Sequence, residues 1–434
     1  MARELAAYMR DPISTFERLA GAYGDVVKMT SKPTDTYLIN DPDLIEDILV
    51  TRDWNFVPVR PVSFGRAFHM STSSSEGYFH RRHRPMFEAP LQPDHIGRFA
   101  HVVTECAGRL RDSWREGAEV DIEQDMARLM SEVMGQLMFG SDTLADPRER
   151  DAAVDAANFI ATRPAHPLGS AREALPFLPE NRRFWSAIGF LDGIIYRRIA
   201  ERRASPDAHD DLLALLLKAR DPIDGQGMSD RQARDEVVSI YMVPSLLMAR
   251  AMTWTFYLLS GHSDVEERLH AEVDGPRDGT VRPLSDPASL PHTHAVIAES
   301  MRLYPPSWIV GRTAVQDFDI GGYTPQAGST FILSAMLTQR DERYFPDPTR
   351  FDMDRWVPEA VAARAEYTYF PFSGGQRDCL GKHFAWLALK LTLATLSEQW
   401  RPRLAPEHRV VPAPLFALCC RHGMRMRLER RASS

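Results

Sequence analysis

One cysteine lies between a glycine-rich loop and an apolar helical pattern near the end of the sequence. In "PFSGGQRDCLGKHFAW" (371–386), two glycines permit a tight turn just before Cys379. A helix start and the positive charge of Arg377 would both stabilise a thiolate there. Such a thiolate could be a nucleophile with His383 as its base, a redox thiol or a metal ligand. A buried structural cysteine is the simplest alternative.

The residues around this cysteine resemble the haem-binding loop of the cytochrome P-450 family. The positions that match the family spacing are Phe372, Gly375, Arg377, Cys379, Gly381 and Ala385. The resemblance implies haem b as the cofactor and Cys379 as its iron ligand, whose thiolate donation favours O–O cleavage. It also implies that Phe372 covers the proximal haem face and that Gly381 lets the following helix approach the porphyrin.

A second motif agrees with this resemblance. The segment "AESMRLYPP" contains Glu299 and Arg302 one helical turn apart, as in the Glu-x-x-Arg helix of the family. The implied third partner is Arg355 in the segment "DRW". Buried charges are tolerated only when they are paired with good geometry. The resemblance therefore implies that these three residues lock the fold around the cysteine loop.

Haem carries propionates, which need cationic or hydrogen-bonding partners. The family positions for these contacts correspond to His80 and Arg84 in "FHRRHRPMF", to Arg312 in "IVGRTA" and to Arg377. For the segment "HRRHR", a basic surface helix is the alternative interpretation.

The resemblance also implies an electron donor. It is closest to soluble bacterial members, which take electrons from a separate ferredoxin and a reductase that draws on NAD(P)H. Arg81, Arg82 and Lys382 are expected to remain outside the haem site. There they would form a positive patch on which an acidic donor could dock.

The long apolar segment 237–259 departs from the family pattern. The family has an acid and a threonine at its centre for proton delivery, and the alignment puts Leu246 and Leu247 at those positions. Pro244 replaces a glycine and frees the carbonyl four residues back, so a kink there could open a groove for oxygen or water. Ser245 has the only hydroxyl in "VPSLLM". Ser245 and Pro244 are therefore the catalytic candidates.

General acid–base help contributes about 10²–10⁴-fold to a rate, so its loss should impair ordinary dioxygen activation. Three explanations remain open. In the first, the substrate supplies its own hydroxyl or carboxylate. In the second, the enzyme uses hydrogen peroxide, and in the third the haem catalyses a rearrangement, dehydration or coupling. A non-catalytic haem-binding auxiliary protein is a fourth alternative.

The substrate pocket is predicted from family positions alone. The residues that should line it come from the loop before "FHRRHR", the long helix, the "PSWIVG" segment and the "APLFAL" turn. They are Phe64, Phe68, Met70, Met242, Leu246, Leu247, Trp308, Val310 and Phe416. This lining predicts an apolar small molecule of moderate size, of the secondary-metabolite type.

The elements that must position these residues are mostly helical. Apolar residues recur every three to four positions in the segments 99–114, 126–140 and 184–203. The segments "DVVKM" and "TYLIN" predict a hairpin, and Ser229 with Gln232 forms a capping box before the long helix. We expect a mainly α fold with small β-sheets, as a single domain over residues 1–434. In the family fold, the haem lies between the long central helix and the cysteine-loop helix.

Composition excludes other classes of protein. The net charge of −7 argues against general nucleic-acid binding. The four cysteines have no zinc-site or disulfide-framework spacing, which favours a reducing, cytoplasmic compartment. Arg250 lies near the centre of segment 237–259 and would add about 2.5–3.5 kcal/mol to membrane insertion. We therefore expect a helix buried in a soluble protein and no membrane anchor.

Overall fold

The protein is represented by a computed structural model. It describes residues 7–8, 10–29, 34–59, 71–140, 152–156, 159, 175, 177–221, 223–275 and 290–431. Contacts group the chain into two compact units, each made from two separate stretches. We call Met1–Arg60 with Ala298–Cys379 the sheet unit, and Pro61–Ile297 with Leu380–Ser434 the helical unit. The prediction of a single domain stays a prediction.

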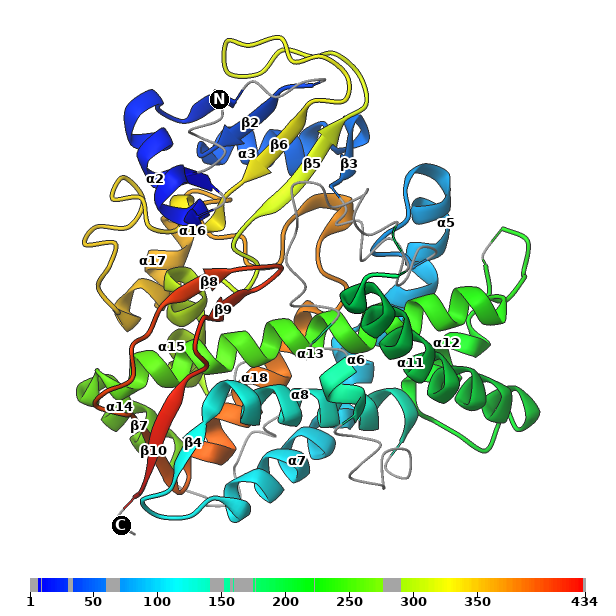
Figure 1. The fold of residues 1–434 in the computed structure, drawn as a ribbon, viewed down its shortest axis with the longest axis vertical. Helices are drawn as coiled ribbons and strands as arrows, with labels where there is room; N and C mark the ends of the chain where they lie inside the picture. The colour runs from blue at the N-terminus through cyan, green and yellow to red at the C-terminus, as the bar shows by residue number, and fades with distance from the viewer. Residues whose placement is uncertain are drawn as a thin grey trace. The chain divides into compact units, whose positions relative to one another are not determined.

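A five-stranded sheet with the order β1-β2-β6-β5-β3 organises the sheet unit (Figure 1). Its strands are β1 (Val26–Met29), β2 (Thr36–Ile39), β3 (Phe56–Pro58), β5 (Val310–Ala314) and β6 (Thr330–Leu333). β1 and β2 pair antiparallel, which confirms the predicted hairpin. β2 and β6 run parallel, and the other neighbours are antiparallel. The buried rings of Tyr37 and Phe331 stack on this sheet with centroids 5.2 Å apart.

Short helical segments precede, connect or follow the strands of this sheet along the chain. They are α2 (Pro12–Tyr23), α3 (Pro42–Glu46), η1 (Asp47–Thr51), η2 (Asp53–Asn55), α16 (Ala335–Thr338), η5 (Met353–Trp356), α17 (Pro358–Ala362) and η6 (Gly375–Arg377). Asp11 and Asp41 cap α2 and α3 by accepting hydrogen bonds from backbone N–H groups, and each helix begins with a proline. α15 (Pro291–Leu303) ends just before "YPP", as predicted.

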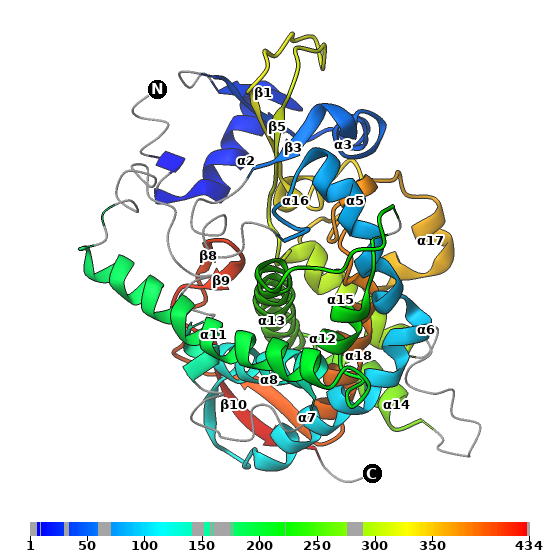
Figure 2. The ribbon, with the colours of Figure 1, turned by 90° about the vertical axis from the view of Figure 1, so that its right-hand side faces the viewer.

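The helical unit contains both long helices and short helical turns. They are α5 (Gly77–Glu88), η3 (Ala89–Leu91), α6 (Pro93–Ile96), η4 (Gly97–Phe99), α7 (Ala100–Ser113), α8 (Ile122–Phe139), α11 (Pro179–Ala204), α12 (Leu212–Lys218), α13 (Asp230–Ser260), α14 (Ser263–Val273) and α18 (Lys382–Ser397). Figure 2 views α13 almost end-on, with α8 and α11 beside it. α18 also packs against α13 and α7.

Two small sheets complete the helical unit. β4 (Glu119–Asp121), β10 (Arg425–Arg430) and β7 (Trp400–Leu404) form one sheet in that order. β8 (Pro412–Pro414) and β9 (Leu418–Cys420) form a hairpin, so the turn predicted at "APLFAL" is present. Both sheets are antiparallel.

α13 is the central helix of the helical unit. Ser229 Oγ accepts the Gln232 N–H at 3.2 Å, which confirms the cap predicted at Ser229. The helix is continuous through Pro244, and the kink that could open a groove there stays a prediction. Among the residues that the structure describes, α13 alone is long and apolar enough to cross a membrane. However, 78% of its most apolar window is buried within the protein, as expected of a core helix.

Candidate functional site

The cysteine loop rests against the core of the sheet unit. The N–H of Cys379 donates to the carbonyl of Phe372 at 2.9 Å and closes the loop. Gly375 has a φ of +67°, and a Cβ there would lie 1.9 Å from the carbonyl oxygen of Leu49 in η1. Any other residue would clash with that backbone, so the glycine is required for the loop to approach η1.

Cys379 differs from the other three cysteines in exposure. Cys379 is exposed, whereas Cys106, Cys419 and Cys420 are buried. Burial raises the pKa of Cys106 to about 12 and raises the pKa of Cys419 and Cys420 as well. A metal ligand must be a thiolate. Cys379 is therefore the cysteine best suited to bind a metal.

Two arginines of the sheet unit accompany the cysteine loop. Arg312 in β5 is 7% exposed, and its Nη2 donates to Ser373 Oγ at 3.3 Å. Burial, and secondly the positive charge of Arg377, lower the pKa of Arg312 to about 10. A buried cation whose charge is opposed by a second cation favours a bound anion. The residues of this loop therefore fit haem, which offers an iron for the thiolate and carboxylates for the arginines.

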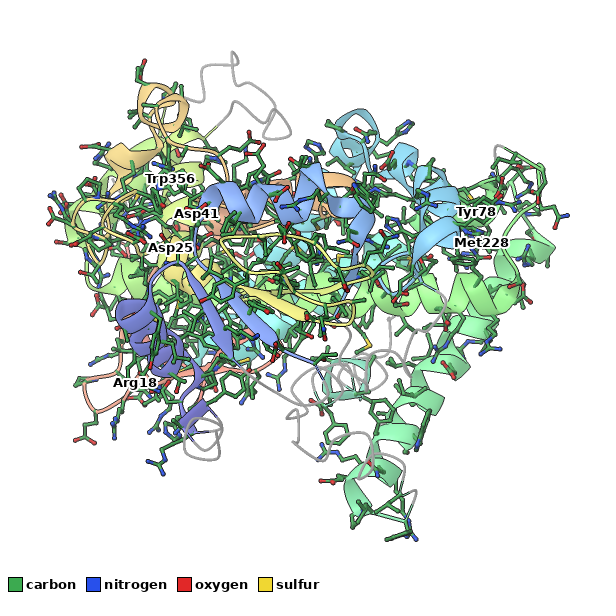
Figure 3. The ribbon with its side chains drawn as sticks, turned by 90° about the horizontal axis from the view of Figure 1, so that it is seen from above. Arg18, Asp25, Asp41, Tyr78, Met228 and Trp356 are labelled. Atoms are coloured by element: carbon green, nitrogen blue, oxygen red, sulfur yellow. The ribbon has the colours of Figure 1, made fainter. Side chains whose placement is uncertain are left out.

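The predicted charge triad is assembled in the sheet unit. Arg302 Nε and Nη2 donate to the two oxygens of Glu299 at 2.7 and 2.8 Å, and both side chains are fully buried. Arg355 Nε lies 3.3 Å from Glu299 Oε1. The carboxylate also accepts the indole N–H of Trp356 (labelled in Figure 3) and the N–H of Asp352, each at 3.0 Å. Sequence reasoning missed Trp356, although it directly follows the arginine in "DRW".

Gln339 connects this triad to the cysteine loop. Its Nε2 donates to the carbonyls of Met301 and Arg302 at 3.0 and 3.1 Å. Its Oε1 accepts the N–H of Phe370, two residues before the loop residue Phe372, at 3.3 Å. The buried amide of Gln339 is therefore hydrogen-bonded both to the end of α15 and to the segment that leads into the cysteine loop. No signal in the sequence pointed to this glutamine.

His80 and Arg84 lie on α5 of the helical unit. His80 is buried, and Arg84 forms an ion pair with Glu88 at 2.8 Å. They lie one helical turn apart, as expected from their spacing in the sequence. Their role as propionate contacts stays a prediction.

Arg82 is not a free surface charge. Its guanidinium pairs with the carboxylates of Asp221 and Asp224 and lies over the ring of Tyr78, which is labelled in Figure 3. The hydrogen bond to Asp221 is the largest of the contacts that raise the pKa of Arg82. The expectation that Arg82 adds positive charge to a docking patch is therefore wrong, because two carboxylates neutralise it. Arg81 is exposed, as expected.

α13 has one partly accessible stripe. Between residues 232 and 256, the side chains that are not buried are Ile240, Val243, Pro244 and Leu247. Their spacing of three, one and three residues puts them on a single face of the helix. All four are apolar. Leu247, at the position of the family threonine, belongs to this stripe, whereas Leu246 and Met242 are buried.

The hydroxyl of Ser245 is engaged within its own helix. Ser245 is buried, and its Oγ donates to the carbonyl of Tyr241 at 2.5 Å. Such a bond to the carbonyl four residues back is common for serine in helices. Ser245 therefore lies off the accessible stripe, while Pro244 lies on it. The catalytic roles of both residues stay predictions.

The remaining pocket candidates lie in different environments. Phe64, Phe68 and Met70 fall outside the described residues. Trp308 is buried and stacks on Phe16, with ring centroids 6.0 Å apart. Val310 in β5 and Phe416 in the β8–β9 turn are half-buried. Their pocket roles stay predictions.

Glu236 is a buried carboxyl on α13 that sequence reasoning missed. Its Oε1 accepts the N–H and the hydroxyl of Thr72 at 2.6 and 2.7 Å. One turn further on, the hydroxyls of Ser239 and Ser73 lie 2.5 Å apart. Burial raises the pKa of Glu236 to about 8. These bonds fasten Thr72 and Ser73, which belong to the predicted pocket loop before "FHRRHR", to α13.

Within the described ranges, no three His, Cys, Asp or Glu side chains gather in a way that could hold a bare metal ion. This is compatible with a single protein ligand to an iron that a porphyrin otherwise coordinates.

Comparisons with known proteins give matches over most of the chain. The profile of the family "Cytochrome P450" matches residues 5–418. Cyclooctat-9-en-7-ol 5-monooxygenase of Streptomyces melanosporofaciens is 33% identical over 405 residues, which cover 92% of this chain and 87% of that protein. Pentalenene oxygenase of Streptomyces avermitilis is 29% identical over 432 residues, covering 98% and 94%.

A solved structure has the same fold. "Retinoic acid bound cyanobacterial CYP120A1" superimposes with a TM-score of 0.85 at 21% identity, covering 96% of this chain and 94% of that chain.

Proposed function

This chain belongs to the cytochrome P450 family, and we propose that it oxygenates a terpene-derived small molecule with electrons from a separate ferredoxin and reductase. It is a haem b enzyme, an oxidoreductase of the monooxygenase type that belongs to secondary metabolism. A monooxygenase inserts one atom of dioxygen into a C–H bond and reduces the other to water, which consumes two electrons and two protons. We place the enzyme in the cytoplasm.

We assign the haem site to the cysteine loop. When bound, haem supplies oxygen activation at an iron whose thiolate ligand favours O–O cleavage. The thiolate of Cys379 would hold the iron, and Arg312 with Arg377 would bind propionate, together with His80 and Arg84. The observation that supports this assignment best is the combination of one exposed cysteine with two mutually repelling arginines near its loop.

The names of the relatives suggest the substrate class. One acts on cyclooctat-9-en-7-ol and another on pentalenene, so each oxidises a largely hydrocarbon skeleton. The apolar accessible stripe of α13 supports the same kind of substrate for this chain. We therefore propose a cyclic terpene hydrocarbon or a terpene alcohol.

A ligand screen tests this proposal. The purified holoenzyme is titrated with cyclic terpenes and terpene alcohols while its haem absorption is followed. We expect a spin-state shift that saturates, and hydroxylated product when ferredoxin, reductase, NAD(P)H and oxygen are added. Absence of a shift with every terpene, together with a shift by an unrelated polar compound, would contradict the substrate class.

A peroxide-driven reaction is the second candidate, and one observation favours it. The accessible stripe of α13 carries neither an acid nor a hydroxyl, whereas hydrogen peroxide brings its own protons and electrons. Product formed with peroxide alone, at a rate above that of the complete oxygen-driven system, would establish it. Product formed with neither oxidant would instead indicate a rearrangement or coupling.

A further inference from the structure

Arg250 and Glu123 form an ion pair inside the helical unit. Arg250 Nη1 lies 2.5 Å from Glu123 Oε1, and the two side chains are 5% and 11% exposed. Glu123 lies in the first turn of α8, and Arg250 lies in the second half of α13. Arg250, the residue that argued against membrane insertion of this segment, therefore has a buried carboxylate as its partner.

The same pair holds β9. Glu123 Oε2 accepts the N–H of Cys420 at 3.2 Å, at the end of this strand. One turn further along α13, the indole N–H of Trp254 donates to the carbonyl of Leu418 at 2.8 Å, at the strand's beginning. α8 and α13 together therefore hold both ends of β9.

β9 in turn determines the position of the hairpin turn. Pro414 pairs with Leu418 and Pro412 pairs with Cys420, which leaves three residues for the turn. Phe416 is the middle residue and is half-buried, whereas Leu418–Cys420 are buried. A shift of β9 would carry Phe416 with it, because so short a turn has little freedom of its own.

A buried ion pair is an inefficient source of stability. The desolvation of two charges offsets most of their attraction, and apolar side chains of similar volume often stabilise a fold as well or better. The pair does, however, supply directional bonds that specify how three elements meet. In this chain the three elements are α8, α13 and β9.

We propose that the Glu123–Arg250 pair positions the β8–β9 turn and thereby determines which substrate shapes the enzyme accepts. Both residues act through Phe416 as positioning residues. The inference rests on the proposed function and on the prediction from family positions that Phe416 lines the substrate pocket of that enzyme.

Three double variants separate positioning from stability. Glu123→Leu with Arg250→Met removes both charges and the acceptor for Cys420. Glu123→Gln with Arg250→Met removes the charges but keeps an amide oxygen for that N–H, and it serves as the milder variant if the first does not fold. Arg202→Met with Asp211→Asn removes a different buried pair of the helical unit, 2.6 Å apart and 5% and 6% exposed, as the matched control.

The first readout does not depend on haem. Hydrogen–deuterium exchange of the 412–420 hairpin should be at least about tenfold faster in the Leu/Met variant, and closer to wild type in the Gln/Met variant. The control variant should leave the hairpin unchanged. Unchanged exchange in a folded Leu/Met variant, or equal acceleration in the control, would overturn the anchoring role.

The second readout is the ratio of the affinities of the holoenzyme for 4-phenylimidazole and imidazole, from haem titrations. Imidazole is too small to reach far into a pocket, so only the phenyl group should sense the displaced turn. We expect the ratio to change at least about fivefold in the Leu/Met variant and not in the control. An unchanged ratio would overturn the role in substrate selection. If imidazole did not shift the haem absorption even of the wild-type protein, the proposed function would fail. The hydrogen-exchange experiment would still decide whether the ion pair anchors the hairpin.

Discussion

The indole N–H of Trp356 donates to the carboxylate of Glu299 at 3.0 Å, on the oxygen that also accepts Arg302 Nε. Replacing Trp356 with Phe should therefore lower the free energy of unfolding by about 1–3 kcal/mol, because a buried carboxylate loses one donor. Chemical denaturation would measure this loss. Tyr78 is an exposed tyrosine on α5, and its replacement with Phe is a control that should cost much less. A Trp356→Phe variant as stable as wild type would contradict the role of this bond.

Replacing Cys379 with Ala should abolish the absorption band of the reduced, carbon-monoxide-bound haem that is typical of thiolate ligation. The reason is that the iron would lose its only protein thiolate, since the other three cysteines are buried. Cys106→Ala is the matched control, because it removes a buried thiol of raised pKa and should keep the band. Persistence of the band in Cys379→Ala would show that another atom binds the iron.

Replacing Arg312 with Gln should weaken haem retention. The guanidinium is buried near Arg377 and its pKa is lowered to about 10, which makes it a strong donor to an anion. Loss of a charge-assisted hydrogen bond corresponds to roughly 10- to 100-fold faster haem dissociation. The rate of haem transfer to an excess of a haem-scavenging protein would measure it. Arg343→Gln, at a more exposed arginine paired with Asp25, should leave that rate unchanged.

The buried carboxyl of Glu236 should make stability depend on pH. Burial raises its pKa from 4.5 to about 8, so the folded state binds this proton more tightly than the unfolded state. Its contribution to stability is present at low pH and is lost as the pH rises from about 4.5 to about 8, by up to about 1.4 kcal/mol per pH unit. Gln resembles the protonated side chain. The Tm of Glu236→Gln should therefore exceed that of wild type increasingly as the pH rises through this window, and parallel Tm curves would count against the shift.

Replacing Leu247 with Thr should raise the yield of product per NAD(P)H consumed in the oxygen-driven reaction. Leu247 lies on the accessible stripe of α13, so a hydroxyl there could orient water for proton delivery. Leu246 is 4% exposed, and a Glu there would bury a charge without a partner and destabilise the protein. The double variant with Leu246→Glu should therefore lose stability relative to Leu247→Thr alone. An unchanged yield in folded, haem-replete Leu247→Thr would mean that proton delivery does not limit the reaction.

The sequence alone determined the features that depend on neighbours along the chain. The φ of +67° at Gly375 favours glycine for reasons of local backbone geometry, and proline ends α15 wherever that helix packs. The spacing of Glu299 and Arg302 on one helix made their pairing predictable. The loss of the acid and the threonine from the central helix was also readable directly from residue types.

Only the tertiary structure decided the features that depend on which distant residues meet. Glu123 and Arg250 lie on different helices, and nothing in either segment indicates the other; the same holds for Arg82 and Asp221. Which face of α13 stays accessible likewise depends on what covers its other faces, because the helix is apolar nearly all round. Local sterics act between neighbours and are encoded in short stretches of sequence. The burial and pairing of charges follow from packing between segments far apart, which no single stretch contains.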